Sequence, residues 1–363
     1  MKKIKIPMAK PSIDKFEINA INKVLKSGWY GQGIKTEKFE KLLSNYFTSP
    51  TICVNNGTSA LLCSLLVHDI KPGDIIVIPS FTFIATSSAP KILGCKIIPV
   101  DVNLQTMNID LNLLEEVFKN NDVKAVIFVD IGGLPNNIHK IKKLCKLYNV
   151  IPIEDAAEAL GSEYKSKKIG SFPHTTTFSF HIAKQITTIE GGCITTKNQL
   201  VLNKLKAIRD HGRIKKGYHH EFVGSNFRTT DIQSVIGISQ LKKINKLLKN
   251  RINIAKQYKS ELSSLEFQEI PSFVSKHSYM LFFVKTKNLK FRNKFVNYLN
   301  SKGIDARNSW LPINLQRCNK ELNSINCSNS LKLFETTFTL PIFNSMTSKE
   351  VDYIIKHCKK FIG

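Results

Sequence analysis

The sequence predicts an α/β fold in which helices cover both faces of a mostly parallel sheet. Short, almost uninterrupted apolar runs alternate with stretches of helical periodicity through the first two-thirds of the chain. Strands that are apolar along their whole length indicate a sheet buried on both sides. A long helical pattern and a second group of apolar runs follow. They predict a smaller α/β domain at the C-terminal end.

The predicted elements come in regular succession. Buried strands are expected at 75–78, 96–100, 125–129 and 150–153, with helices near 60–68, 83–93, 111–119 and 137–147. Two more strands are expected at 175–180 and 193–196, one long helix at about 231–262, and small-domain strands near 280–285 and 337–342. We place the large domain at residues 1–245 and the small domain at residues 246–363.

The chain carries a formal net charge of +25 over 363 residues. Its lysines are spread along the whole chain, many on the outer faces of predicted helices, without a dense basic tail. This distribution favours a lysine-rich surface over a nucleic-acid site, so no nucleic-acid partner is expected. Such a surface would still attract a small anionic substrate.

The eight cysteines and nine histidines show no spacing typical of a metal or redox site. We therefore expect reduced thiols and no metal ion. No segment approaches the roughly 20 apolar residues of a membrane-spanning helix. No apolar stretch follows the basic N-terminus, so a secretory signal is not expected. The sequence predicts a cytoplasmic protein without a membrane partner.

Three polar segments stand where ligands of such sheets bind, close to the carboxyl ends of predicted strands. Gly57-Thr58-Ser59 leads into an apolar helix, which suits a phosphate cradle or an ordinary helix cap by Thr58 or Ser59. Asp155 follows a buried strand among small residues, where a functional acid competes with a surface acid. Lys184 lies in a stretch free of other charges until Glu190, which suits a shielded reactive amine as well as a surface lysine.

A phosphate cradle, an acid and a lysine are the three parts that pyridoxal 5′-phosphate (PLP) needs. The cradle anchors the phosphate, the acid keeps a proton on the pyridine nitrogen, and the lysine forms an imine with the aldehyde. Their order on an α/β sheet is typical of fold-type I PLP enzymes, which have the aspartate aminotransferase-like fold.

Six segments carry a resemblance to a known family. They are 28–33, 56–60, 79–83, 154–157, 179–184 and 224–233. With these segments the chain resembles the DegT/DnrJ/EryC1/StrS family of sugar-nucleotide aminotransferases over nearly its whole length. The resemblance implies a homodimer with shared active sites, because Asn226 would reach the phosphate of the partner's PLP. It also implies an N-terminal substrate loop containing Trp29 and Tyr30.

The resemblance assigns further cofactor contacts. Phe83 would stack on the PLP ring, Ser179 would bind its phosphate together with Gly57, Thr58 and Ser59, and Glu158 would lie beside the cofactor. Asp155 would pair with the pyridine nitrogen and Lys184 would carry the imine. His181, Arg213 and Arg228 are candidates for substrate contacts. Both arginines could grip a diphosphate, although salt bridges in a domain interface explain them equally well.

The reaction implied by the resemblance is a ping-pong transamination. L-Glutamate would leave its amino group on the cofactor as pyridoxamine 5′-phosphate, with Lys184 moving the proton, and an NDP-keto sugar would then take the amino group. The sequence around Lys184 is closer to members acting at carbon 4 of the sugar. The predicted product is therefore an NDP-4-amino-4,6-dideoxyhexose of the viosamine or perosamine type, made for glycan synthesis.

Several departures from the family pattern leave the substrate open. Glu158 stands where Gln or His is common, Ile189 where Gly is usual, and Ser225 where Tyr or Phe is common. Three alternatives remain. A sugar 3-aminotransferase differs in the carbon attacked, and a PLP-dependent sugar dehydratase would carry His at the imine position. A basic DNA-binding or regulatory protein on the same fold would lack the Lys or the Asp.

Overall fold

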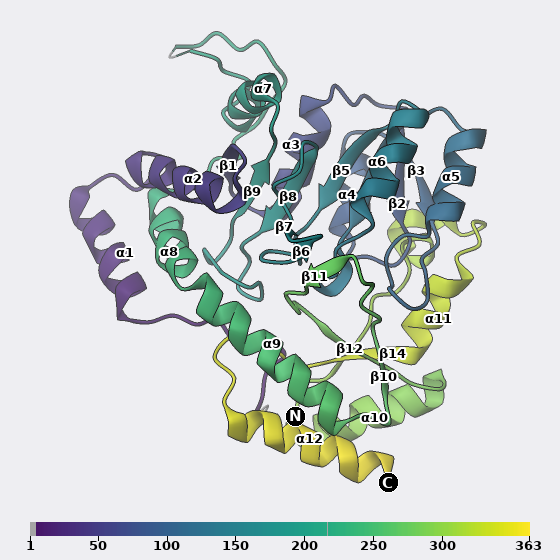
Figure 1. Cartoon of the computed structure of the whole chain (residues 1–363). Helices are drawn as coiled ribbons and strands as arrows, with labels where there is room; N and C mark the ends of the chain where they lie inside the picture. The colour runs from purple at the N-terminus through teal and green to yellow at the C-terminus, as the bar shows by residue number, and fades with distance from the viewer. Residues whose placement is uncertain (1–4, 216) are drawn as a thin grey trace.

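A seven-stranded sheet forms the centre of the computed structural model, which describes residues 5–215 and 217–363 (Figure 1). In spatial order its strands are β1 (Thr51–Val54), β9 (Gly192–Thr195), β8 (Thr175–Ser179), β5 (Ile151–Asp155), β4 (Val123–Val129), β2 (Ile75–Pro79) and β3 (Lys96–Val100). Strand β9 is antiparallel to both neighbours, and the other pairings are parallel. Every strand except β9 therefore ends at the same edge of the sheet. The predicted α/β class with a mostly parallel sheet is confirmed.

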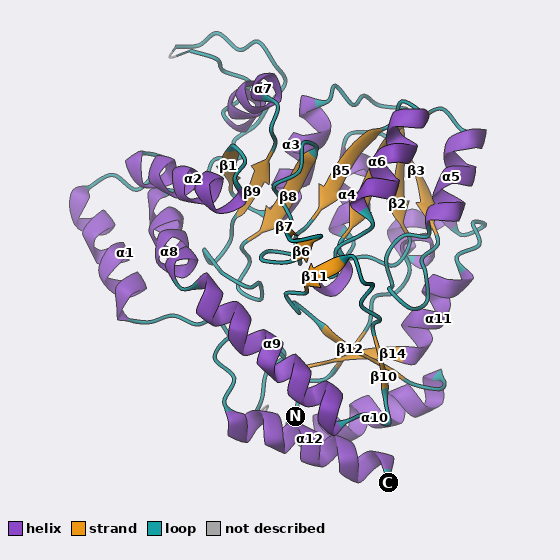
Figure 2. Ribbon diagram, viewed as in Figure 1, coloured by secondary structure: helices purple, strands orange, loops and turns teal. Residues whose placement is uncertain are grey.

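Helices cover both faces of this sheet (Figure 2). One face carries α3 (Gly57–Val67), α4 (Ala85–Ile92) and α7 (Gln199–Arg209), and the other carries α5 (Leu111–Asn120) and α6 (Ile138–Leu147). Successive side chains of a strand point to opposite faces. Ile76 and Ile78 accordingly pack with Leu61 of α3, while Val77 between them packs with Ile141 of α6. This two-sided burial explains why the strands are apolar throughout.

Helix α2 (Ile34–Phe47) is capped by a distant part of the chain. Its N-cap, Gly33, has no side chain to accept the first N–H groups of the helix. The carboxylate of Asp231, the first residue of α8 (Asp231–Lys242), accepts from the N–H groups of Gly33, Lys35 and Thr36 at 2.9–3.1 Å. This buried contact joins α2 to α8. Helix α1 (Lys15–Ser27) packs beside them (Figure 1).

A second, antiparallel sheet lies below the first in the view of Figure 1. Its order is β10 (Glu266–Phe267), β12 (Phe282–Lys285), β14 (Thr337–Leu340) and β13 (Arg307–Asn308). Helices α9 (Ile244–Glu261), α10 (Leu289–Ser301) and α12 (Ser348–Ile362) share one apolar core with it, which includes Tyr258, Phe295 and Phe338. Helix α11 (Ser328–Thr336) leads into β14, and β11 (Val274–Lys276), β6 (Glu163–Tyr164) and β7 (Lys167–Lys168) form a small third sheet.

The single long helix predicted at about 231–262 is wrong. Helix α8 ends at Lys242 and α9 begins at Ile244, because Lys243 has ψ 7° and leaves the helical path. The break lets α8 pack against α1 and α2 while α9 runs on to the small sheet (Figure 1). Among the described residues, no helix combines the length and the apolar character that crossing a membrane requires.

Candidate active site

A cavity of about 820 Å³ opens where the strands of the large sheet end. The small sheet forms its opposite wall through β12, β13 and β14, and the N-terminal segment 7–11 closes one side. Nine of the residues predicted for the site line this cavity, which brings together segments far apart in the sequence. They are Gly57, Thr58, Ser59, Phe83, Asp155, Glu158, Ser179, His181 and Lys184.

The first turn of α3 forms one end of the cavity. Its N-cap is Asn56, whose side chain accepts from the N–H of Ser59 at 2.8 Å, so the alternative of a cap by Thr58 or Ser59 is wrong. Within the described chain, the N–H groups of Gly57 and Thr58 have no acceptor. Free N–H groups at the positive end of a helix dipole attract phosphate.

Glycine is required at position 57 by a close approach. A Cβ atom added there would lie 2.9 Å from the Cβ of Ser179, the last residue of β8. The Ser179 hydroxyl therefore lies against the same helix start, and its oxygen accepts from the N–H of His181 at 3.3 Å. The hydroxyl and the helix N–H groups together form a cradle suited to an anion.

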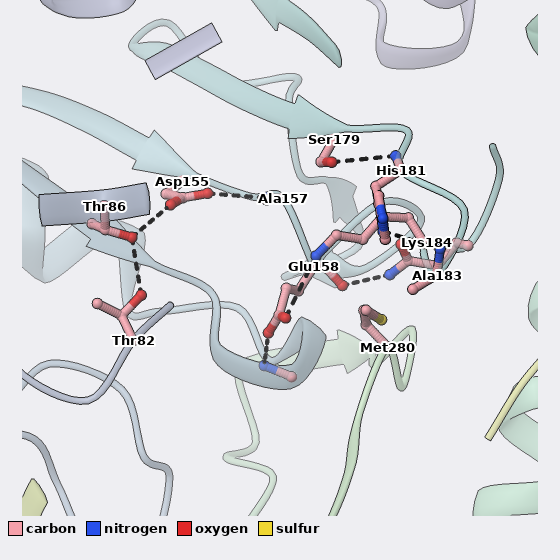
Figure 3. A network of polar contacts seen from close by, with 12 residues as sticks. Thr82, Thr86, Asp155, Ala157, Glu158, Ser179, His181, Ala183, Lys184 and Met280 are labelled. Carbon is pink, nitrogen blue, oxygen red and sulfur yellow. Dashed lines mark hydrogen bonds and ion pairs between the residues drawn. The ribbon is translucent and has the colours of Figure 1, made fainter. Parts of the chain in front are cut away.

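Asp155 is the last residue of β5 and is 5% exposed. Its Oδ2 accepts a hydrogen bond from Thr86 Oγ1 at 3.0 Å, and its Oδ1 accepts one from the N–H of Ala157 at 3.2 Å (Figure 3). Burial raises the pKa of this carboxyl group, although both hydrogen bonds and the charge of Lys184 oppose the rise. A cation placed against Asp155 would favour its ionised form.

Lys184 enters the cavity from the turn that follows β8. Its backbone N–H donates to the carbonyl of His181 at 2.9 Å, and its side chain is only 15% exposed. The Nζ atom lies 3.6 Å from Glu158 Oε1 (Figure 3). Glu158 is held in place by the N–H of Gly132, which donates to its Oε2 at 2.9 Å. The turn thus presents a shielded amine beside a fixed carboxylate.

The arrangement provides an anion cradle, a buried acid and a shielded amine in one cavity. Comparison with known proteins identifies a family of enzymes to which the chain belongs. The model of the DegT/DnrJ/EryC1/StrS aminotransferase family matches residues 11–359. The chain belongs to this family. It is therefore an enzyme of the aminotransferase class.

Two relatives match this chain along most of their length. The chain is 31% identical over 359 residues to the GDP-perosamine synthase of Escherichia coli O157:H7, covering 98% of both chains. It is 32% identical over 356 residues to the UDP-4-amino-4,6-dideoxy-N-acetyl-beta-L-altrosamine transaminase of Campylobacter jejuni, covering 94% of both.

A solved structure shows the same fold. The putative sugar aminotransferase Spr1654 of Streptococcus pneumoniae, in its PMP form, superposes with a TM-score of 0.92 at 28% identity. The match covers 98% of this chain and 99% of that one. The predicted fold, that of the PLP aminotransferases, is confirmed.

Five residues predicted for the site are absent from the cavity lining that the described residues form. Trp29 and Tyr30 are exposed in the loop between α1 and α2. Asn226 is exposed beside Asn55, whose side-chain amide donates to its carbonyl at 3.4 Å.

Arg213 and Arg228 both bind Asp210. Arg213 Nη2 lies 2.5 Å from Asp210 Oδ2, and Arg228 Nη1 donates to Oδ1 of the same carboxylate. Both arginines therefore form salt bridges, but all three residues lie within the predicted large domain rather than between the two domains.

The cavity wall contributed by the small sheet was not predicted from the sequence. Asp305, Arg307, Ser309 and Trp310 line the cavity around β13, and Met8 lines it from the N-terminal segment. Strand β13 is only two residues long and shows no strand pattern, so nothing local marks these residues. Among the described residues, no group of three or more His, Cys, Asp and Glu side chains is arranged to hold a metal ion.

Proposed function

We propose that the chain is a PLP-dependent sugar-nucleotide aminotransferase that acts at carbon 4. It would transfer the amino group of L-glutamate to an NDP-4-keto-6-deoxyhexose and release an NDP-4-amino-4,6-dideoxyhexose of the viosamine or perosamine type for glycan synthesis. The observation that carries this proposal is the shielded Lys184 amine, which shares one cavity with Asp155 and the α3 cradle. The names of the two relatives, a perosamine synthase and a 4-amino-4,6-dideoxy sugar transaminase, support carbon 4.

The residues present fit PLP part by part. The Gly57–Ser59 turn and Ser179 would hold its phosphate, because the helix start has free N–H groups and Gly57 leaves the approach open. Asp155 would pair with the pyridine nitrogen, Phe83 would cover the ring, and Lys184 would hold the aldehyde carbon. When bound, PLP supplies an electron-accepting ring that makes the α-proton of an amino acid removable.

Three side chains of the chain would have separate roles in the reaction. Lys184 Nζ would take the proton from the α-carbon of the amino donor, because it is the shielded amine at the cavity wall. Glu158 keeps that amine in place through the contact at 3.6 Å. Asp155 would pair with a positive ring nitrogen, because burial makes its unpaired carboxylate unfavourable.

We also propose that two copies share their active sites. Asn226, Trp29 and Tyr30 are exposed and lie outside the chain's own cavity lining. Exposed apolar side chains such as Phe16 and Ile34 on α1 and α2 offer a surface that a second copy would cover. Lys184→Ala and Asn226→Asp should each be inactive alone, and mixing them should restore activity in mixed dimers, whereas no recovery would contradict shared sites.

The function is tested by supplying the purified PLP-loaded protein with L-glutamate and a panel of UDP-, GDP- and dTDP-linked 4-keto-6-deoxy sugars. Transfer should yield a 4-amino sugar, identified by mass spectrometry and NMR, together with 2-oxoglutarate. Conversion of 3-keto sugars alone would instead favour the 3-aminotransferase alternative. Loss of a hydroxyl group without amine transfer would favour the dehydratase.

A further inference from the structure

The cavity contains a second fixed cation opposite Lys184. Among the described residues that line it, the lysine and arginine side chains are those of Lys184 and Arg307. Lys184 comes from the large sheet and is committed to the chemistry proposed above. Arg307 belongs to β13 of the small sheet, and no reaction role has been assigned to it so far.

The guanidinium group of Arg307 makes a two-pronged contact with Asp305. Its Nε donates to Asp305 Oδ1 at 3.0 Å and its Nη2 donates to Oδ2 at 2.8 Å. Asp305 is itself fixed, because its Oδ2 also accepts from the N–H of Met8 at 3.0 Å and its backbone N–H donates to the carbonyl of Ile6 at 2.9 Å. The N-terminal segment thus contacts Asp305, and the carboxylate of Asp305 in turn contacts Arg307.

This contact occupies only one edge of the guanidinium. Arginine has five N–H donors, and Asp305 engages those of the Nε–Nη2 edge. The Nη1 group and the second hydrogen of Nη2 have no acceptor within the described chain. They form the other two-pronged edge, whose geometry matches the two oxygens of a carboxylate or a phosphate. Hydrogen bonding to Asp305 also raises the pKa of Arg307, so the group keeps its charge throughout the working pH range.

We propose that Arg307 binds an oxyanion of the substrate through the free edge of its guanidinium. The proposal rests on the proposed function for the identity of the oxyanion, which is a carboxylate of the amino donor or the diphosphate of the sugar nucleotide. Asp305 is the positioning residue, since its carboxylate accepts from the Nε–Nη2 edge of Arg307.

Calorimetric binding to the PLP-loaded protein tests the proposal without requiring turnover. The probes are glutarate, which keeps both carboxylates of glutamate but lacks its amine, and the nucleotides UDP, GDP and dTDP. Charge-assisted hydrogen bonds are strong enough that Arg307→Gln should lower the binding affinity for at least one probe by roughly 10- to 100-fold. Loss of glutarate binding assigns the donor carboxylate, and loss of nucleotide binding assigns the diphosphate.

Two matched variants sharpen this result. Arg307→Lys keeps the charge but loses the two-pronged edge, so it should recover only part of the affinity. Arg317→Gln makes the same chemical change outside the cavity lining and should leave binding unchanged. The proposal is overturned if Arg307→Gln binds every probe within twofold of the unmodified protein, or if the unmodified protein binds none. If no amine transfer occurs but Arg307→Gln still loses binding, the proposed reaction fails and the oxyanion site stands.

Discussion

Replacing Asp155 with Asn should stabilise the cofactor-free protein and weaken its hold on PLP. The carboxyl group is buried, and burial raises its pKa. A group with a raised pKa in the folded state contributes stability at low pH that is lost as the pH rises through that pKa. At neutral pH the ionised carboxylate therefore costs about 1.4 kcal/mol for each pH unit by which its pKa is raised. Asn removes this cost.

The local hydrogen bonds can survive the substitution. The Asn oxygen can still accept from the N–H of Ala157, and the Thr86 hydroxyl can rotate to accept from the new amide. An amide cannot balance a positive ring nitrogen, however. The loss of one charge-assisted hydrogen bond costs about 1.5–3 kcal/mol, which corresponds to PLP binding weaker by roughly 10- to 150-fold.

Thermal unfolding of the cofactor-free proteins between pH 4 and 8 and a titration with PLP measure the two effects. Asp130→Asn is the matched control, because Asp130 is also buried with a raised pKa but lies outside the cavity lining. It should gain stability at neutral pH without changing PLP affinity. The reasoning is refuted if Asp155→Asn binds PLP as tightly as the unmodified protein. It is also refuted if the stability of cofactor-free Asp155→Asn depends on pH as that of the unmodified protein does.

Three further substitutions have definite expected outcomes. Ile189 has φ 74°, which costs a β-branched residue about 1–2 kcal/mol, so Ile189→Gly should raise the melting temperature by about 1–3 °C in calorimetry; a lower melting temperature than that of the unmodified protein would contradict the strain. Asp231→Ala should cost about 3–5 kcal/mol in denaturant unfolding because it leaves the start of α2 without acceptors, whereas Asp14→Ala at the cap of α1 should cost only about 1 kcal/mol, and equal losses would argue against this difference. Gly57→Ala should weaken PLP binding at least tenfold by spectroscopic titration. The control Gly31→Ala, with no atom within 4 Å of the added Cβ, should leave PLP binding unchanged. Unchanged PLP binding in Gly57→Ala would contradict the proposed phosphate cradle.

The parts of the fold visible in the sequence are those that local pattern determines. Strand β2 is apolar at every position because both of its faces are buried. Strand β1 was missed, since its four residues become a strand only by pairing with β9, about 140 residues later. The break at Lys243 was also missed, because neither Pro nor Gly marks it and the packing of α8 and α9 on different partners causes it.

The residues of the site likewise fall into those that local sequence predicts and those that only the tertiary fold brings to the cavity. Gly57, Asp155 and Lys184 were found because each follows a strand or begins a helix at the edge where parallel strands end. Arg307 was not, because it reaches the cavity only when the small sheet docks. The strained backbone of Ile189 was not foreseen either, although the departure from the usual Gly was visible in the sequence.

The most direct test of the proposed chemistry is the chemical identification of the lysine that binds PLP. The purified protein is incubated with PLP, reduced with borohydride, digested and mapped by mass spectrometry. The shielded position of Lys184 predicts that the reduced pyridoxyl group is found on this residue and is absent from the Lys184→Ala variant. Labelling spread over exposed lysines, or unchanged labelling and turnover in Lys184→Ala, would contradict the account.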